Sequence, residues 1–289
     1  MIPAPFDYHT PASLDEALAL LQEYGFEAKV LTGGQSLIPM MKLRLAEPEH
    51  IIDLNGIPGL AYIREEGGYV KIGALTREAE LEASALIGAK LPILHDTGKL
   101  IADPQVRNLG TLGGNLAHGD PGNDHPATML ALSAQVVAVG PNGQRTIAIT
   151  DFFVDFYTTA LEPEEILTEI QIPLPPPGSG GAYLKLERKV GDYATAGVAA
   201  QVTIDATGRC TEAGIGLTNV SFVPIKATDA EAHLRGSALT EEDLDEAARL
   251  AAAASRPSSD LRGSEAYKRA MVRVLTKRAL HRAIARARG

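Results

Sequence analysis

Leu31-Thr32-Gly33-Gly34-Gln35-Ser36-Leu37 and its counterpart Leu109-Gly110-Thr111-Leu112-Gly113-Gly114-Asn115-Leu116 are the stretches around which this chain is organised. Each is a glycine-paired loop next to an apolar segment. Glycine tolerates positive φ and lets a ligand approach the backbone, and successive N–H groups in such turns form concave nests for phosphate oxygens. The Ser36 and Thr111 hydroxyls add donors. One Gly-Gly pair is equally consistent with an ordinary turn, but two together favour a cofactor that carries a diphosphate.

The residues around both loops resemble those of a known family. The first loop continues into Lys42-Leu43-Arg44 and Ile52-Asp53-Leu54. The run Ile101-Ala102-Asp103-Pro104-Gln105-Val106-Arg107-Asn108 leads into the second, and Gly119-Asp120-Pro121-Gly122-Asn123-Asp124 follows it. This pattern is similar to the FAD-binding medium subunits of molybdenum hydroxylases, the xanthine oxidase family, and most similar to those of the aerobic carbon monoxide dehydrogenase type. The resemblance covers nearly the whole chain and is specific for the flavoprotein subunit, but not for the substrate.

The resemblance implies a set of FAD contacts. Asp124 is expected to accept hydrogen bonds from the ribitol or ribose region, Lys185 to stabilise negative charge at the pyrimidine end of the reduced ring, and Tyr193 to pack on or beside the isoalloxazine. Related oxidases carry a histidine for covalent attachment where this chain has Gln35, so non-covalent FAD is expected. The implied cofactor-binding residues are Leu31, Thr32, Gly33, Gly34, Gln35, Ser36, Leu37, Ile101, Ala102, Gly110, Thr111, Gly113, Gly114, Asn115, Asp124, Leu161, Lys185 and Tyr193.

The resemblance also implies how the work is divided between subunits. A substrate is oxidised at the molybdenum cofactor of a large subunit, and electrons cross two [2Fe-2S] clusters of a small subunit. FAD on this chain then passes them to an external acceptor such as a quinone. The implied complex is a dimer of heterotrimers. Carbon monoxide is the leading substrate, and aldehyde, nicotine or purine hydroxylases are alternatives. No catalytic residue and no metal ligand is expected in this chain.

Composition limits the function classes. The net charge of the 289 residues is −9 and Trp is absent, so the chain lacks the basic field and most of the stacking surface that nucleic acids require. Cys210 is the only cysteine, which rules out cluster ligation by several thiolates of this chain. No apolar run reaches membrane-spanning length and no signal peptide is visible, so we expect a cytoplasmic protein, placed at the inner face of the membrane through its partners if at all.

The fold class expected is α+β. The resemblance implies a two-subdomain FAD-binding domain of the vanillyl-alcohol-oxidase/p-cresol-methylhydroxylase type, followed by a three-stranded antiparallel sheet with a helical bundle. We divide the chain into residues 1–57, 58–175 and 176–289, because the Pro/Gly-rich segment 173–181 is the clearest change in composition. Capping and periodicity predict helices over 14–24, 36–41, 76–81, 91–101, 228–234, 241–254 and 265–285, with Ser13, Ser36, Thr76, Thr240 and Ser264 as caps. Alternation predicts strands over 28–31, 50–54, 69–73, 135–139, 144–149, 166–172, 182–188, 198–204 and 213–217.

Several features have a second interpretation. His118, Asp120, Asp124 and His125 are close in sequence, but their spacing matches no established metal site. Without the resemblance, Asp124 is a helix N-cap, Lys185 an exposed strand cation and Tyr193 a loop aromatic over a domain seam. The basic residues at the end of the last helix favour a solvated face stabilised by the helix dipole over a docking surface. A stand-alone flavin oxidase and a non-catalytic nucleotide-binding protein are the alternatives at the level of function.

Overall fold

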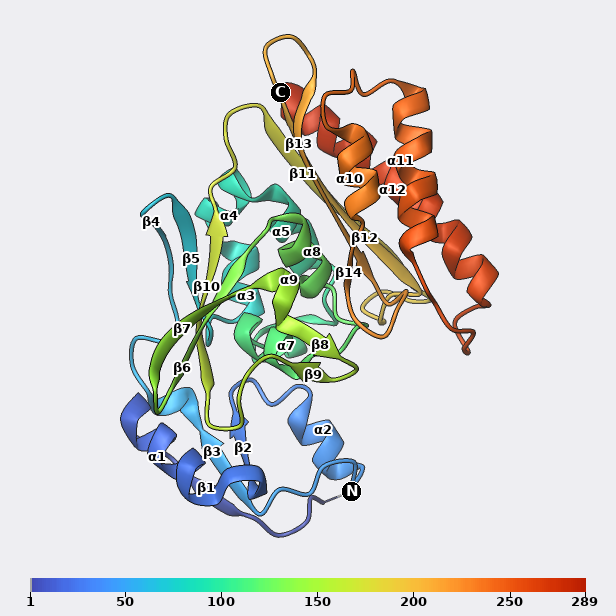
Figure 1. Ribbon diagram of the computed structural model, residues 1–289. Helices are drawn as coiled ribbons and strands as arrows, with labels where there is room; N and C mark the ends of the chain where they lie inside the picture. Colours follow the sequence, from blue (N-terminus) through green and yellow to red (C-terminus); the bar gives the residue numbers. More distant parts are fainter. Residues whose placement is uncertain (1) are drawn as a thin grey trace.

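The computed structural model describes residues 2–289 and contains several separate sheets, which follow one another along the chain (Figure 1). The N-terminal sheet has the order β1-β3-β2, with β1 (Asp7–His9) and β2 (Ala28–Leu31) parallel to β3 (His50–Asp53). Helix α1 (Leu14–Tyr24) starts where the Ser13 hydroxyl accepts from the Glu16 N–H, and it ends at Gly25 with φ of +53°. The first glycine loop joins β2 to α2 (Leu37–Lys42). It therefore lies at the carboxyl end of a parallel strand, where open α/β sheets bind ligands. Two short 3-10 turns complete this part, η1 (Gly25–Glu27) and η2 (Leu54–Gly56).

The middle part is built on an antiparallel sheet of order β4-β5-β10-β6-β7. The predicted hairpin is confirmed, because β6 and β7 pair up to Gly140 opposite Gly143. The strands are β4 (Ile63–Glu66), β5 (Tyr69–Gly73), β6 (Gln135–Gly140), β7 (Gly143–Ala148) and β10 (Ile166–Pro173), and a separate small hairpin consists of β8 (Phe153–Asp155) and β9 (Thr158–Thr159). The helices are α3 (Glu78–Ala83), α4 (Ala85–Lys90), α5 (Pro92–Lys99), α6 (Pro104–Arg107), α7 (Leu112–His118), α8 (His125–Ala131) and α9 (Ile149–Phe152).

The C-terminal part carries an antiparallel sheet covered by three helices (Figure 1). Its order is β11-β12-β13-β14, so the prediction of three strands was short by β14 (Ile225–Lys226), which is only two residues long. The other strands are β11 (Ser179–Leu186), β12 (Ala196–Ile204) and β13 (Cys210–Thr218). Helices α10 (Thr228–Leu234) and α11 (Glu241–Ala254) have the predicted bounds, and α12 (Glu265–Arg288) runs slightly further than predicted.

Glycines set how closely this sheet approaches the middle part. A Cβ at Gly214 or Gly216 of β13 would overlap the carbonyls of Ala131 and Ala127 on α8. The backbone of β13 therefore lies directly on α8, which only glycine allows. This packing brings the start of α8, and with it Asp124, beside β11.

Two predicted caps are wrong. Thr76 does not cap α3, because its hydroxyl accepts from the Tyr62 N–H at 3.1 Å and donates to the Tyr62 carbonyl at 3.0 Å. Helix α3 instead begins after Arg77, whose N–H is accepted by the Glu80 carboxylate at 2.7 Å. Ser36 precedes α2 as expected, but its side chain makes no capping hydrogen bond.

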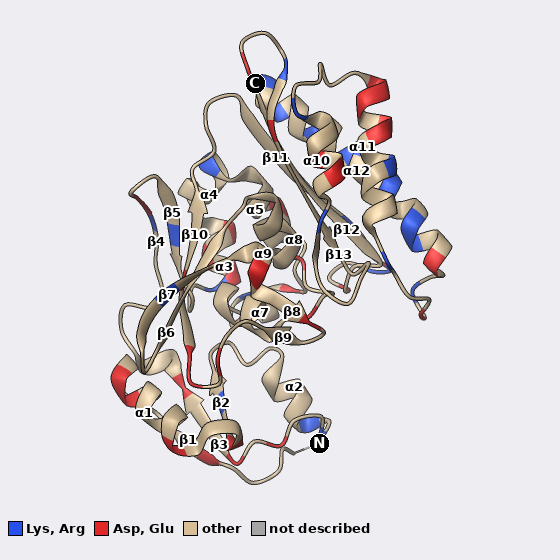
Figure 2. Cartoon of the chain, viewed as in Figure 1, with Lys and Arg blue, Asp and Glu red and all other residues tan. Residues whose placement is uncertain are grey.

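Ion pairs occupy part of the basic end of α12. Figure 2 shows Lys and Arg along this helix, and acidic residues on α1 and the start of α11. Arg286 and Arg282 both reach Asp96 on α5, at 2.6 and 3.2 Å, and Lys277 pairs with Asp245 at 2.8 Å. The interpretation as a purely solvated face is therefore wrong for these arginines, which tie the last helix to the middle part.

No helix among residues 2–289 is long and apolar enough to cross a membrane.

Candidate functional site

A cavity of about 740 Å³ lies between the two glycine loops and the start of the C-terminal sheet. Its volume is within the range of cofactor pockets. Every residue of the predicted cofactor-binding set lines it, from Leu31 in the first loop to Tyr193 after β11. The fold thus brings together segments that are more than 150 residues apart in sequence. Their contact with FAD stays a prediction.

The two glycine loops touch each other at the base of the cavity. Gly33 lies so close to Leu109 and Gly110 that a Cβ on it would overlap the Leu109 carbonyl. The Arg77 guanidinium spans the same seam, because it donates both to the Leu109 carbonyl and to the Asn55 side chain. The N-terminal sheet and the middle part therefore meet at the loops themselves.

A pair of hydroxyls completes this seam. The Thr32 and Thr111 hydroxyls share a hydrogen bond of 2.9 Å. A Cβ on Gly114 would lie 2.7 Å from the Thr111 oxygen and 2.8 Å from the Thr32 oxygen. Any side chain at position 114 would therefore collide with these hydroxyls unless they moved, so the close packing here favours glycine.

Free backbone donors are found in the first loop. Within the described chain, the N–H groups of residues 33–37 have no hydrogen-bond acceptor, and Gly34 has φ of +69°. This is the geometry of an anion nest, and it begins a helix whose dipole also favours negative charge. A diphosphate would satisfy these donors without any cationic side chain.

The second loop differs from the expectation of a second nest. The N–H groups of Leu112 and Gly113 donate to the Thr76 and Ala74 carbonyls at 3.1 and 2.9 Å, and those of Gly114 and Asn115 bond back to Thr111. In the described residues, Gly110, Gly113 and Gly114 are not among the glycines with positive φ. The loop is therefore a helix start capped by Thr111, and its glycines serve close packing.

Asn115 offers the cavity an unpaired acceptor. Its side-chain oxygen is buried and has no hydrogen-bond partner in the described part of the chain, while it lines the cavity. Such an atom costs free energy unless a ligand donor reaches it. A hydroxyl of a ribitol or ribose fits this requirement, so the residues present suit FAD.

Lys185 is buried, and the alternative of an exposed strand cation is wrong. Its side chain is 1% exposed, and the ammonium donates to the Leu100 carbonyl at 2.7 Å, the Asp124 carboxylate at 2.9 Å and the Asp192 carbonyl at 3.0 Å. An ammonium has three N–H groups, so all of its donors are taken by the protein. Lys185 therefore offers the cavity no free hydrogen bond, and its positive charge is partly offset by Asp124 and, at 3.5 Å, by Glu187.

Asp124 is held by the same cluster. Its side chain makes no capping bond to α8, so the N-cap interpretation of this side chain is wrong. It accepts from Lys185 and from the hydroxyl of Tyr183. Burial raises the pKa of Asp124, and the Lys185 charge and the Tyr183 hydrogen bond oppose that rise.

Two tyrosines flank the mouth of the cavity. Tyr193 belongs to residues 189–193, called here the Tyr193 loop, and its half-exposed ring contacts Gly122, where a Cβ would lie 3.2 Å from it. Tyr157 in the β8–β9 hairpin has φ of +52° and also lines the cavity. Burial, together with Asp120, raises the pKa of both phenols, so both stay protonated at neutral pH.

The Ile101-Ala102 segment is fixed from two sides. Arg107, which the sequence analysis did not assign a role, donates to the Ile101 carbonyl at 3.0 Å and pairs with Glu82 at 2.9 Å. On the other side, the backbone of Gly191 lies directly against that of Ala102, which has φ of +43°. These contacts hold the Ile101-Ala102 segment in place as part of the lining of the cavity.

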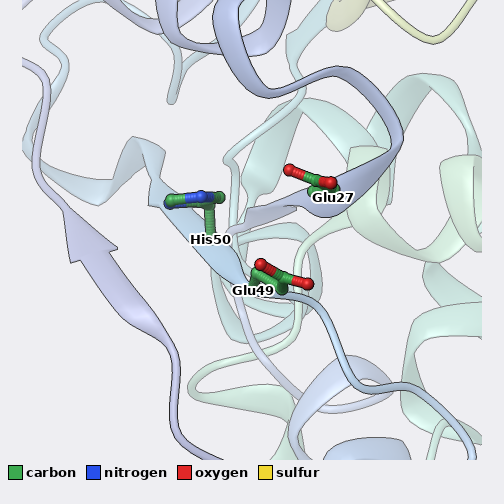
Figure 3. Close-up of side chains that lie close together, drawn as sticks. All are labelled: Glu27, Glu49 and His50. Carbon is green, nitrogen blue, oxygen red and sulfur yellow. The ribbon is translucent and has the colours of Figure 1, made fainter.

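Residues of metal-ligand type do not converge at the cavity. Asp124 pairs with Lys185, and His125 bonds Glu78 at 2.7 Å in a fully buried contact. In residues 2–289, one group of three such side chains comes together, Glu27, Glu49 and His50 at the N-terminal sheet (Figure 3). The His50 ring stacks on Tyr24 with 3.8 Å between centroids and shares a hydrogen bond with His9, and both carboxylates are exposed.

These features define a class of protein: an α+β chain with an anion nest at the end of a parallel strand and a cavity suited to a flavin dinucleotide. Residues 4–175 match the family described as the FAD binding domain in molybdopterin dehydrogenase, and residues 181–283 match the carbon monoxide dehydrogenase flavoprotein C-terminal domain. The chain belongs to this family of FAD-binding oxidoreductase subunits, which confirms the resemblance and the fold class seen in the sequence.

Relatives with known roles cover the chain from end to end. The carbon monoxide dehydrogenase medium chain of Afipia carboxidovorans is 51% identical over 288 residues, covering 100% of both chains. The 6-hydroxypseudooxynicotine dehydrogenase complex subunit alpha of Paenarthrobacter nicotinovorans is 39% identical, covering 100% of this chain and 97% of its own length. Among solved structures, carbon monoxide dehydrogenase from Hydrogenophaga pseudoflava lacking the Mo-pyranopterin moiety matches with a TM-score of 0.97 at 52% identity, covering 99% of each chain.

Several lining residues were missed by the sequence analysis. Glu78, Tyr157 and Asn123 line the cavity together with the predicted set. The dense turn formers of 119–124 were a signal for Asn123, whose amide donates to the Asn115 carbonyl at 3.0 Å. No local signal marks Glu78 or Tyr157, because each reaches the cavity through the tertiary fold.

Proposed function

We propose that this chain is the FAD-binding electron-transfer subunit of a carbon monoxide dehydrogenase-type molybdenum hydroxylase. It would receive electrons from the [2Fe-2S] clusters of a small subunit and pass them to an external acceptor such as a quinone. The observation that carries the proposal is the cavity, which combines the nest of residues 33–37, the unpaired Asn115 oxygen and the buried Lys185 charge. The identity to the carbon monoxide dehydrogenase medium chain is greater than that to the 6-hydroxypseudooxynicotine dehydrogenase complex subunit alpha, 51% against 39%, which favours carbon monoxide as the substrate. A complex acting on aldehydes, nicotine or purines is the alternative.

Each part of the cavity has a role in this proposal. FAD, when bound, would supply chemistry that accepts electrons singly and releases them singly or in pairs. The N–H groups of residues 33–37 would hold its diphosphate, and Asn115 would accept from a sugar or ribitol hydroxyl. Lys185 would raise the affinity for the reduced, negatively charged ring through its field alone, because its hydrogens are already bound. Tyr193 would cover the ring from the solvent side.

Substrate oxidation would take place on partner subunits. Cys210 is the only cysteine and is buried, so this chain lacks the several thiolates that hold an iron-sulfur cluster. We infer a molybdenum-containing large subunit and a small subunit with two [2Fe-2S] clusters, assembled as a dimer of heterotrimers. A cytoplasmic complex that meets quinones at the inner face of the membrane through its partners is consistent with the charge of −9 on this chain.

Non-covalent FAD is the first expected result. Gln35 stands in the loop where an attached flavin needs a histidine, and no cysteine lines the cavity. Precipitation of the holoprotein with acid should leave the flavin in the supernatant, as measured by its absorbance. Yellow colour that stays with the washed pellet would contradict a non-covalent site.

Electron entry through a partner is the second expected result. Carbon monoxide or an organic substrate, mixed with the isolated FAD-loaded chain under anaerobic conditions, should leave the flavin absorbance unchanged, because the chain offers no group that activates a substrate. Addition of the reduced iron-sulfur subunit should bleach it. Bleaching by substrate alone would show a stand-alone oxidase and remove the electron-relay proposal.

A further inference from the structure

The Tyr193 loop is held by a contact that lies outside the cavity. Asp192 precedes Tyr193, and its carboxylate accepts from the Tyr193 N–H at 2.8 Å and from the Arg262 guanidinium at 3.0 Å. The Asp192 side chain is only 8% exposed and that of Arg262 26% exposed. The Arg262 guanidinium carbon also lies 5.9 Å from the centre of the Tyr193 ring. Arg262 therefore acts on both the backbone and the ring of this loop.

Arg262 projects from a turn that a second carboxylate fixes. Asp260 accepts from the N–H groups of Arg262 and Gly263, at 2.8 and 3.2 Å, through one oxygen. Its other oxygen accepts from Lys268 at 2.7 Å, and the Lys268 side chain is 2% exposed. The turn is thereby anchored to α12, which is itself tied to α5 through Asp96. The turn that carries Arg262 is therefore fixed independently of the contact between Arg262 and Asp192.

A second arginine provides a comparison at the same carboxylate. Arg188 donates to the other oxygen of Asp192 at 3.0 Å, but its side chain is 54% exposed. Exposed ion pairs contribute little, whereas a charge-assisted hydrogen bond shielded from water contributes more. Together the two arginines hold the pKa of Asp192 down at about 2, so its carboxylate stays charged across the working range of pH.

We propose that Arg262 is a positioning residue, which latches the Tyr193 loop through Asp192 and so keeps the Tyr193 ring over the mouth of the flavin cavity. With the latch made, Gly191 stays packed against Ala102 and the ring stays on Gly122. With the latch broken, the Lys185 contact to the Asp192 carbonyl, the exposed Arg188 contact and the packing of Gly191 on Ala102 remain, but nothing holds the Tyr193 ring, and the ring leaves the mouth. The inference depends on the proposed function at one point only, namely that the cavity covered by the Tyr193 loop holds FAD.

Hydrogen exchange tests the latch without FAD. In the full-length apo chain, the amides of residues 189–194 should exchange about tenfold faster in Arg262→Gln than in wild type, whereas Arg188→Gln should change them less than threefold. Asp192→Ala removes the acceptor of the same contact, and adding Arg262→Gln to it should give no further increase. Exchange within threefold of wild type in a folded Arg262→Gln chain overturns the proposal.

The flavin reports the position of the ring. In the FAD-loaded chain, Arg262→Gln should raise flavin fluorescence toward the level of Tyr193→Ala, because a tyrosine beside the ring quenches it. Arg262→Lys, which keeps the charge and a donor, should restore part of the quenching. A general loss of packing would not be rescued by lysine. Faster exchange with unchanged fluorescence would refute the link between the latch and the ring, and a failure to bind FAD would count against the proposed function while the exchange result stands.

Discussion

The Gly114→Val chain is expected to fold and to bind FAD about one hundredfold more weakly than wild type. The new Cβ would lie within 2.8 Å of the Thr32 and Thr111 hydroxyl oxygens, whose hydrogen bond joins the two loops. Because Gly114 lines the cavity, the rest of the valine side chain would also take up space that the cofactor needs, and each 1.4 kcal/mol of binding free energy lost is about a tenfold change in affinity. Titration of the apo chain with FAD, followed by fluorescence, measures the effect.

Gly88→Val is the matched control. Gly88 lies on α4, and nothing is within 4 Å of the place its Cβ would take. This chain should bind FAD as wild type does. A wild-type dissociation constant in folded Gly114→Val would show that the junction of the loops is irrelevant to the cofactor.

Lys185→Met is expected to lower the free energy of unfolding by about 3–5 kcal/mol at pH 8, because it leaves the buried Asp124 carboxylate without its cation. Lys277→Met removes contacts to Asp245 and Glu241 on the surface, where the Lys277 and Asp245 side chains are 31% and 50% exposed, and should cost much less than Lys185→Met does. Urea unfolding of both variants gives the comparison. Equal losses of unfolding free energy in Lys185→Met and Lys277→Met would contradict the burial of the Lys185–Asp124 pair.

The loss in Lys185→Met should depend on pH. Burial raises the pKa of Asp124 and the Lys185 charge opposes that rise, so in Lys185→Met the pKa of Asp124 in the folded chain lies higher still above its value in the unfolded chain. The stability from that proton is present at low pH and is lost as pH rises through the folded-state pKa. The difference from wild type should therefore shrink from pH 8 to pH 5. When both chains also carry Asp124→Asn, the stability difference caused by Lys185→Met should be nearly independent of pH.

Much of the fold is predictable because it is encoded locally. Thr240 and Ser264 cap α11 and α12 as expected, with hydrogen bonds of 3.2 Å to the third N–H of each helix. The two glycine loops were found because glycine pairs beside apolar segments are rare signals. The short strands β1, β4, β8, β9 and β14 were missed, since two to four residues carry little periodicity and their pairing is decided by the tertiary fold.

The residues that line the cavity were predictable, but the contacts that their side chains make were less so. The family resemblance pointed to Lys185, yet its burial follows from Asp124, 61 residues earlier in the chain. Thr76 looked like a helix cap, but the tertiary fold gave it the Tyr62 backbone instead. Arg107 and Arg262 act through carbonyls and carboxylates that only the folded chain brings within reach. Local sequence thus specifies the loops, and the tertiary fold specifies what fills the space between them.

All three N–H groups of the Lys185 ammonium are hydrogen-bonded to the protein, and this bears on the rate of the proposed electron transfer. An ammonium with a free hydrogen would turn toward a flavin that gains charge and turn back when the charge leaves. Here the Leu100 carbonyl, the Asp124 carboxylate and the Asp192 carbonyl fix its orientation in both states. Preorganised charges act without rearrangement at the moment of reaction. If the proposed electron-transferring flavin is bound in this cavity, Lys185 would add little to the reorganisation energy of the transfer.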